Sequence, residues 1–397
     1  MYVVVHNNAG IFGGGEIAAA RLLRGLQARG HRVHMLCRDA TIAGRARGEG
    51  IPTGVMRIGG DAMITDALRF ARWLRRERPD AVLLTTFSKL VLASWGARLG
   101  GVPRVFYRVV LSSDLPHNTL DRLACRRFLD GVVLNAAAMR APFLAASPRL
   151  DPARVHVVHD GAEPPRAALP AGALRAALGI PESAPVIGSV TRFAHQKRLD
   201  RLLGAFARLP GDAHCVLAGE GTELQAMKAW VDVAGLGPRV HFLGFREDVG
   251  DVLAALDVFV VSSDREGLAG AMLEAMAAGV PVVSTDVSGA GEALAIGSDD
   301  PAGVTVGFDE GELAAACASL LGDPALSARL ASAGRRRALE AFSHQAMVLA
   351  YERLLGGTAG DARAGAPAAA GPEGGSGMPP GPGGEQGVPA GTGRVPS

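Results

Sequence analysis

The sequence has few cysteines and no long apolar run, and each shortage excludes a class of protein. Its four cysteines (Cys37, Cys125, Cys215 and Cys317) are widely spaced and form no Cys-x-x-Cys pair. This argues against a zinc site and a disulfide framework, and it is typical of a reducing compartment. No run of about 18 apolar residues occurs, so we expect no membrane-spanning helix. Residues 2–5 already resemble a strand rather than a signal peptide, so we expect a cytoplasmic protein.

Charge is distributed unevenly along a chain whose formal net charge is only +2. Residues 1–163 contain 23 Lys and Arg against 13 Asp and Glu, a net charge of +10. Residues 164–397 contain the other 18 Lys and Arg and 26 Asp and Glu, a net charge of −8. A basic first half fits contact with an anionic acceptor or an anionic membrane surface. An arginine-rich composition without functional meaning is the alternative, and it stays open at this point.

Length and periodicity predict two α/β domains. A chain of 397 residues with 48% apolar content has more apolar residues than the core of one small domain would bury. Short β-branched runs alternate with longer apolar-periodic runs, which is typical of parallel α/β units. In the first domain, residues 1–163, we expect strands at 2–5, 32–36, 81–85, 104–109, 131–134 and 155–158. In the second, residues 164–342, we expect strands at 186–190, 214–218, 240–243, 258–262 and 282–284.

Two further segments follow these domains. A helix over residues 343–355 is expected to cross back and brace the first domain. Residues 356–397 are nearly all Gly, Pro, Ala and Glu, so we expect a disordered tail. The predicted fold class is α/β, with two Rossmann-like domains and a ligand site in the cleft between them.

A glycine-rich turn follows the first predicted strand. Gly13, Gly14 and Gly15 precede Glu16, where we expect a helix to begin. Such a turn lets the backbone approach a ligand and points amide donors at an anion. The pattern is not Gly-x-Gly-x-x-Gly, which argues against an ordinary dinucleotide site. A tight turn without any ligand is the alternative.

Two cations follow the first strand of the second domain. Arg192 and Lys197 lie where the strand at 186–190 would enter a loop. Two cations there could neutralise a diphosphate, including one that gains charge as it leaves during a reaction. A solvated surface pair is the alternative.

Two glutamates stand in the stretch from Ser263 to Glu292. Glu266 and Glu274 are eight residues apart, so we expect both to address the same side of one short helix. The loop at 267–270 would direct free N–H groups toward sugar and phosphate oxygens. Glu274 is suited to bind two vicinal ribose hydroxyls. Two solvated acids on an amphipathic helix are the alternative.

Together these segments resemble the retaining nucleotide-sugar glycosyltransferases of the GT-B fold, in the large group often called family four. The resemblance runs from Met1 to about Leu355, and its most specific part is the glutamate pair with AMAAGVPVVSTDVSG at 275–289. Segments 188–200, 217–221 and 240–246 match further stretches of the family, as do the opening GGGE and the Arg-Gly-His at 29–31. The implied fold is two Rossmann-like domains facing each other across a cleft.

The resemblance implies a role for each matched position. Arg192 and Lys197 would hold the donor diphosphate and assist its departure. Glu274 would bind the ribose, and Glu266 would hold the transferred sugar. The other implied donor-binding residues are Gly14, Gly15, Gly267, Leu268, Ala269, Gly270, Gly244, Phe245 and Arg246.

One departure from the family concerns a histidine that many relatives place in the cleft. Here that position falls at Val109, so the histidine is missing. His117 or Asp114 could be displaced into the site, and His117 is therefore a catalytic candidate, with a solvated loop histidine as the alternative. Asn135 replaces a usual serine, and Asp160 replaces the asparagine of an asparagine–glycine turn.

The implied activity is transfer of a sugar from a UDP- or GDP-sugar to a glycan, lipid-linked or small-molecule acceptor, with retention of anomeric configuration. We expect no metal, no other cofactor and no nucleic-acid partner, and we expect peripheral contact with the inner face of an anionic membrane. Two alternatives remain. A non-catalytic nucleotide-sugar-binding protein is favoured by the missing histidine. A nucleotide-sugar epimerase of the same fold would require further acids in the cleft.

Overall fold

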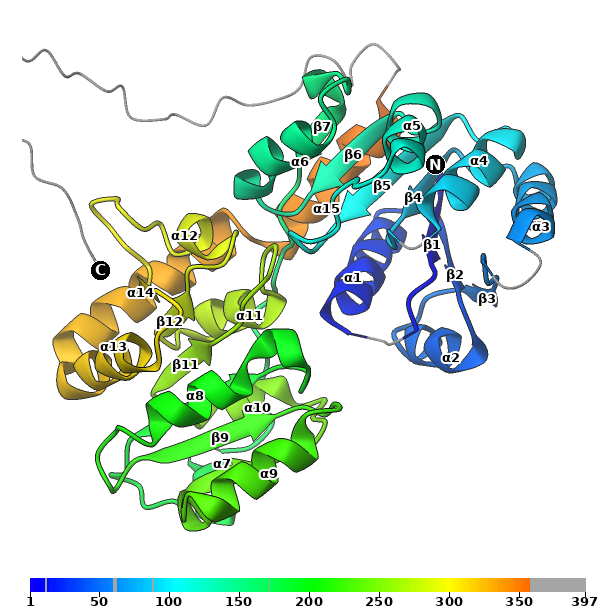
Figure 1. Ribbon diagram of the computed structural model, residues 1–397. Helices are drawn as coiled ribbons and strands as arrows, with labels where there is room; N and C mark the ends of the chain where they lie inside the picture. Colours follow the sequence, from blue (N-terminus) through cyan, green and yellow to red (C-terminus); the bar gives the residue numbers. More distant parts are fainter. Residues whose placement is uncertain (11–12, 60–62, 88, 171, 358–397) are drawn as a thin grey trace, which may run out of the picture. The chain divides into compact units, whose positions relative to one another are not determined.

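The computed structural model describes residues 1–357 except 11–12, 60–62, 88 and 171. Two parallel sheets of seven and six strands organise this part of the chain (Figure 1). The tail predicted at 356–397 lies outside the described residues from 358 onward. No helix among the described residues is long and apolar enough to cross a membrane.

The first sheet has the strand order β3-β2-β1-β4-β5-β6-β7. Its strands are β1 (Tyr2–Asn7), β2 (Arg32–Cys37), β3 (Thr53–Val55), β4 (Ala81–Leu84), β5 (Arg104–Val109), β6 (Gly131–Leu134) and β7 (Val155–Val157). Its helices are α1 (Gly14–Ala28), α2 (Ala40–Gly48), α3 (Met63–Glu77), α4 (Leu90–Leu99), α5 (Thr119–Arg127) and α6 (Arg140–Ala146). The consecutive Val3, Val4 and Val5 are all fully buried, because helices cover both faces of a parallel sheet.

The second sheet has the order β10-β9-β8-β11-β12-β13. Its strands are β8 (Val186–Val190), β9 (His214–Ala218), β10 (Val240–Phe242), β11 (Val258–Val261), β12 (Val282–Thr285) and β13 (Val304–Val306). Its helices are α7 (Ala173–Ala177), α8 (Leu199–Phe206), α9 (Leu224–Val233), α10 (Val249–Ala254), α11 (Gly270–Ala278), α12 (Ala290–Ala293), α13 (Glu310–Gly322) and α14 (Pro324–Glu340). The strand order reverses between β8 and β11, and ligands of such sheets bind outside the carboxyl ends at this reversal.

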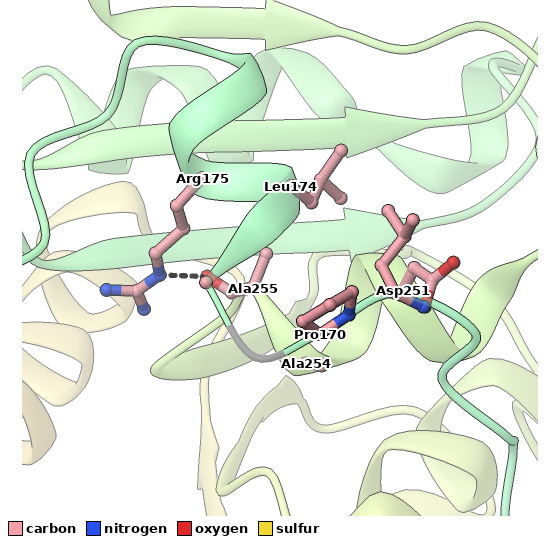
Figure 2. Close-up of a pocket in the computed structure, with 8 residues that line it drawn as sticks. Pro170, Leu174, Arg175, Asp251, Ala254 and Ala255 are labelled. Atoms are coloured by element: carbon pink, nitrogen blue, oxygen red, sulfur yellow. Dashed lines mark hydrogen bonds between the residues drawn. The ribbon is translucent and has the colours of Figure 1, made fainter.

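The segment between the two sheets is anchored to α10 (Figure 2). The backbone amides of Ala168 and Leu169 donate to Asp251 Oδ1 at 2.6 and 2.9 Å, and Arg175 Nε donates to the carbonyl of Ala255 at 2.9 Å. The cavity lined by Leu174 and its neighbours measures only about 10 Å³, about the space of a single water. This cavity lies where the segment attaches to α10, and it is too small for a ligand.

The last helix, α15 (His344–Gly356), packs against α1. Tyr351 and Leu355 are fully buried in the core cluster that contains β1. Glu352 accepts from Arg29 at 2.7 Å and contacts His31 Nε2 at 2.6 Å. The helices approach closely because α1 carries Gly25, where an added Cβ would lie 2.3 Å from Val348 Cγ2.

We therefore expect Gly25→Ala to destabilise the protein by about 1–3 kcal/mol, because the new methyl group overpacks the contact between α1 and α15. Urea unfolding measures the change. Gly44→Ala on α2 is the matched control, because nothing lies within 4 Å of its Cβ position and alanine favours a helix. A Gly25→Ala protein as stable as the Gly44→Ala protein would contradict the close contact.

Candidate functional site

The loops that leave the carboxyl ends of β8 and β11 meet each other. The amide of Asp264 donates to the carbonyl of Gln196 at 2.9 Å, and Ser262 Oγ donates to the carbonyl of Lys197 at 2.8 Å. The Lys197 ammonium forms an ion pair with the Glu266 carboxylate. Two candidates predicted from separate motifs therefore lie together at the reversal point of the second sheet.

Arg192 occupies a short stretch of fixed backbone beside this pair. On either side of it, the Thr191 amide donates to the carbonyl of Ala218, the last residue of β9, at 3.0 Å, and the Phe193 amide donates to the carbonyl of Glu220 at 2.8 Å. Glycine permits this approach, since an added Cβ at Gly219 would lie 1.8 Å from the Thr191 carbonyl and one at Gly221 2.1 Å from the Phe193 carbonyl. No carboxylate of the described residues forms an ion pair with Arg192, so its charge can serve an anionic ligand.

Glu266 lies in the loop, not on the helix. The prediction that Glu266 and Glu274 share one side of a short helix is wrong, because α11 begins only at Gly270, after the extended Ala269. Glu266 is instead held by Lys197 and by Ser263 Oγ, which donates to it at 2.8 Å. It is 6% exposed, so its carboxylate faces the loop interior and the Lys197 ammonium.

Glu274 lies on α11, and its side chain contacts a residue of the first domain. Arg21 Nη2, on α1, lies 2.6 Å from Glu274 Oε1. Glu274 is only 9% exposed, which contradicts a solvated surface acid. A diol that binds this carboxylate must share it with the Arg21 guanidinium or replace that guanidinium.

The loop between Glu266 and α11 packs closely on backbone of the first domain. A Cβ at Gly267 would lie 2.3 Å from Asn135 Oδ1 and 2.5 Å from the Val110 carbonyl. Leu268 is buried and Ala269 caps α11, so Gly270 is its first helical residue. Any larger side chain at position 267 would displace the loop that carries Glu266.

The predicted donor-binding residues Gly244, Phe245 and Arg246 follow β10. The Gly244 carbonyl accepts from the Gly219 amide at 2.7 Å, and Gly244 has a left-handed φ of +69°. Arg246 forms an ion pair with Asp248, so its side chain is already engaged. Phe245 is 52% exposed, and the Arg45 guanidinium lies 5.5 Å from its ring centroid.

The glycine turn opens α1 above a buried ionic network. Gly14 is the first residue of α1, and the Gly15 carbonyl accepts from Arg108 Nη1 at 3.3 Å. Arg108 is fully buried and pairs with Asp160 at 2.5 Å, which also accepts from Asn135 Nδ2 at 2.9 Å. Sequence reasoning treated Asn135 and Asp160 only as departures from a family pattern and assigned Arg108 no role. An arginine inside the apolar strand RVFYRV was the signal for this network.

His117 lies apart from these residues. It is exposed, its Nδ1 is 2.9 Å from the Leu115 carbonyl and its Nε2 is 3.8 Å from Asp121. Its contacts with the described residues include none of the donor-binding candidates. Val109, the position of the missing histidine, is fully buried. Burial raises the pKa of the nearby Asp114 to about 6.

The described residues contain no group of three or more His, Cys, Asp or Glu that could hold a metal ion.

Two protein families match the chain, one over each of its two Rossmann-like domains. The family described as Glycosyltransferase Family 4 matches residues 12–166. The family described as Glycosyl transferases group 1 matches residues 172–337 and thus includes Arg192, Lys197, Glu266 and Glu274.

Curated relatives extend these matches. The lipopolysaccharide core biosynthesis glycosyltransferase LpsE of Rhizobium meliloti is 38% identical over 181 residues, 46% of this chain and 52% of the relative. This match spans about half of the relative's length. The 2-deoxystreptamine glucosyltransferase of Streptomyces kanamyceticus is 34% identical over 291 residues, 66% of this chain and 73% of the relative.

Solved structures share the fold. Anabaena Alr3699/HepE, solved in complex with UDP, has a TM-score of 0.79 at 20% identity and covers 90% of this chain and 100% of its own. WaaG, a glycosyltransferase involved in lipopolysaccharide biosynthesis, has a TM-score of 0.67 at 18% identity, covering 90% and 100%. The predicted GT-B fold of two Rossmann-like domains is confirmed. With two matching families and a relative 34% identical over 73% of its length, the chain belongs to the group 1 glycosyltransferases.

Proposed function

We propose that this protein is a glycosyltransferase that moves a sugar from a nucleoside diphosphate donor to a separate acceptor hydroxyl. The proposal is supported chiefly by the ion pair between Lys197, which shares the loop after β8 with Arg192, and Glu266 at the reversal point of the second sheet. Membership of the group 1 glycosyltransferases supports it.

In the proposed reaction the bond between the anomeric carbon and the diphosphate oxygen breaks. Negative charge grows on the departing diphosphate, and Arg192 and Lys197 stabilise it there. The acceptor oxygen bonds to the anomeric carbon from the same face, and its proton passes to the departing phosphate oxygen. This same-face course, with retention of configuration and no metal, rests on the family resemblance.

Two carboxylates would hold the rest of the donor. Glu274 would bind the ribose diol in exchange for part of its contact with Arg21. Glu266 would accept from hydroxyls of the transferred hexose while it keeps Lys197 oriented. We propose a UDP-sugar as donor, since Anabaena Alr3699/HepE, which has the same fold, was solved with UDP and with UDP-glucose.

The charge of the first 163 residues supports an anionic acceptor, a glycan or lipid-linked glycan. The name of the Rhizobium meliloti relative places that protein in lipopolysaccharide core biosynthesis. A net charge of +10 would attract phosphate- or carboxylate-bearing acceptors.

Exposed apolar and basic side chains on α3 and α5 support contact with the inner face of an anionic membrane. Ile64 and Leu68 of α3 are 62% and 48% exposed, and Leu120 and Leu123 of α5 are 61% and 45% exposed. The helix α4 packs against both α3 and α5, so the two helices that carry these residues are joined through α4 (Figure 1). Exposed arginines accompany them on the same helices: Arg69, Arg72, Arg122 and Arg126.

The alternative is a nucleotide-sugar-binding protein without catalysis, which the buried Val109 at the histidine position favours. A binder would bind UDP-sugar, yet it would release no UDP with or without acceptor. An enzyme would release UDP at a rate that rises with acceptor, as chromatography of the nucleotides measures.

For the donor site we expect Lys197→Ala and Glu274→Gln each to weaken UDP binding roughly 10- to 100-fold, the value of one hydrogen bond to a charged group. Isothermal titration calorimetry with and without EDTA measures this, and we expect EDTA to change nothing. Lys228→Ala, on the exposed side of α9, is the control and should bind as wild type does. Equal affinities of all four proteins would refute the assigned site.

For the membrane face we expect the wild-type protein to sediment with vesicles rich in phosphatidylglycerol at about 0.05 M salt and to stay in solution at about 0.5 M salt. The Leu120→Ser, Leu123→Ser double variant should lose binding, because it removes the apolar contact. Val233→Ser is the matched control, since Val233 is 92% exposed on α9 of the second sheet. Equal loss by both variants, or no wild-type binding at low salt, would refute this contact.

A further inference from the structure

Arg198, the residue directly after Lys197, has an unfavourable backbone conformation. Its φ and ψ are both 48°, in the left-handed region that residues other than glycine seldom adopt. Such conformations persist where the surrounding structure holds them, and they cluster at functional sites. The contacts of the Arg198 side chain show what holds this one.

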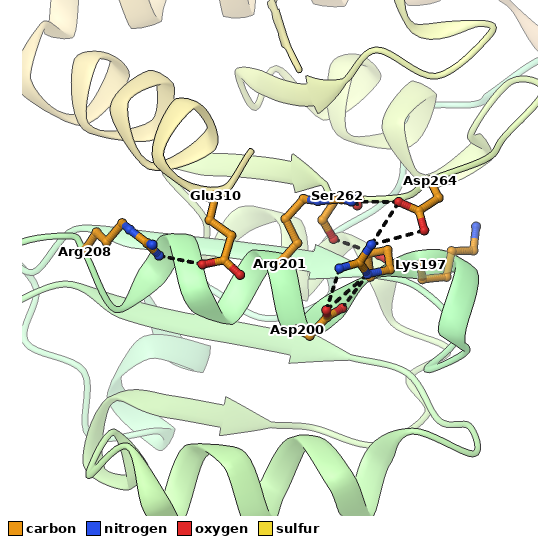
Figure 3. A network of polar contacts seen from close by, with 8 residues as sticks. Lys197, Asp200, Arg201, Arg208, Ser262, Asp264 and Glu310 are labelled. Atoms are coloured by element: carbon orange, nitrogen blue, oxygen red, sulfur yellow. Dashed lines mark hydrogen bonds and ion pairs between the residues drawn. The ribbon is translucent and has the colours of Figure 1, made fainter. Parts of the chain in front are cut away.

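The Arg198 guanidinium bridges two carboxylates on different segments, Asp200 and Asp264, both of which are labelled in Figure 3. It donates to Asp200, in the first turn of α8, at 2.8 to 3.1 Å. It also donates to both oxygens of Asp264, in the loop after β11, at 3.3 Å. The strained residue therefore ties the start of α8 to the loop that carries Glu266.

A second arginine reinforces the same connection from inside α8. Arg201 is only 4% exposed, and it donates to the Ser262 carbonyl at 2.6 Å and to Asp264 Oδ1 at 2.7 Å. Burial alone would raise the pKa of Asp264, but hydrogen bonds from Arg201 and Arg198 lower it below its usual value. The Asp264 carboxylate thus stays charged between two guanidinium groups.

The backbone of these residues is continuous with the donor-binding side chains. The Asp264 amide and Ser262 Oγ donate to the carbonyls of Gln196 and Lys197. Lys197 precedes Arg198, and Glu266 follows Asp264 by two residues. A change in the distance between Arg198 and Asp264 would therefore move the Lys197 ammonium relative to the Glu266 carboxylate.

We propose that Arg198, Arg201 and Asp264 form a clamp that positions Lys197 and Glu266 for the donor diphosphate. The proposal rests on the donor site of the proposed function and assigns all three as positioning residues. They act through the two loops, since Asp200 and Asp264 together balance the charges of the two arginines. The competing interpretation is that Arg198 is a further cation that binds the diphosphate directly.

Asp264→Asn separates the two interpretations by the sign of its effect. Removing a negative charge close to a diphosphate strengthens binding if electrostatic attraction is all that matters. If the clamp interpretation is right, Asp264→Asn removes the carboxylate that holds both arginines, and Lys197 and Glu266 shift slightly. We then expect UDP binding to be roughly tenfold weaker. Isothermal titration calorimetry with UDP measures the affinity, or with GDP if the wild-type protein binds GDP instead.

Arg198→Gly tests whether UDP binding needs the Arg198 side chain or only the left-handed backbone at this position. Glycine adopts the left-handed conformation freely, so we expect a melting temperature within about 5 °C of wild type. Because the bridge to Asp264 is gone, we still expect UDP affinity to fall roughly tenfold. Arg208→Ala is the matched control: it removes an arginine–carboxylate pair with Glu310, 2.6 Å long, near the far end of α8. It should leave UDP affinity unchanged.

Each outcome decides the proposal. Weaker binding by both Asp264→Asn and Arg198→Gly at near wild-type stability, with Arg208→Ala unchanged, supports the clamp. Tighter or unchanged binding by Asp264→Asn refutes it, and so does wild-type affinity of Arg198→Gly. If the wild-type protein binds none of UDP, GDP and ADP, the donor site itself is refuted and the clamp with it. If the wild-type protein binds UDP and both variants bind it with the same affinity, the clamp is refuted but the donor site is not.

Discussion

The direct pairing of β8 with β11 is the constraint on which the site depends. The two strands are neighbours in the sheet but lie far apart in the sequence, so the loops at their carboxyl ends must pack against each other. One loop supplies Lys197 and the other supplies Glu266, and their ion pair is largely shielded from water. A buried ion pair of this kind is weak evidence for stability, and in the proposed function its role is to hold a cation in place for the donor diphosphate.

The site also depends on residues of the first domain. Arg21 holds Glu274, and the Glu292 carboxylate accepts from the Ala137 amide at 2.8 Å and contacts His159. Beneath these contacts the buried Arg108 pair connects the glycine turn to the segment that precedes the second sheet. The two Rossmann-like domains are therefore joined by charged contacts. Such contacts can exchange partners when a charged ligand binds, which a purely apolar interface could not do.

The sequence predicted both Rossmann-like domains because their long strands are β-branched and buried. It missed β3 and β13, which contain no buried residue, whereas it predicted the equally short β7 and β10, each of which begins with a buried valine. Among the site residues, Lys197 and Glu266 were predicted from motifs, but their contact depends on a strand pairing that no local pattern specifies. Glu266 was placed on a helix because spacing alone cannot show that α11 starts at Gly270. The clamp depends on a contact between Arg198 and Asp264, which are 66 positions apart in the sequence, and no periodic pattern predicts such a contact.

A crystal structure of the protein with UDP would show directly whether Arg192, Lys197 and Glu274 hold the donor. We expect the diphosphate to contact Arg192 and Lys197 and the ribose hydroxyls to contact Glu274, with Arg198 still bridging Asp200 and Asp264. Arg21 should have moved from Glu274 or should share it with the ribose. UDP bound elsewhere, or bound without contact to Lys197 and Glu274, would show that the donor site is wrongly assigned.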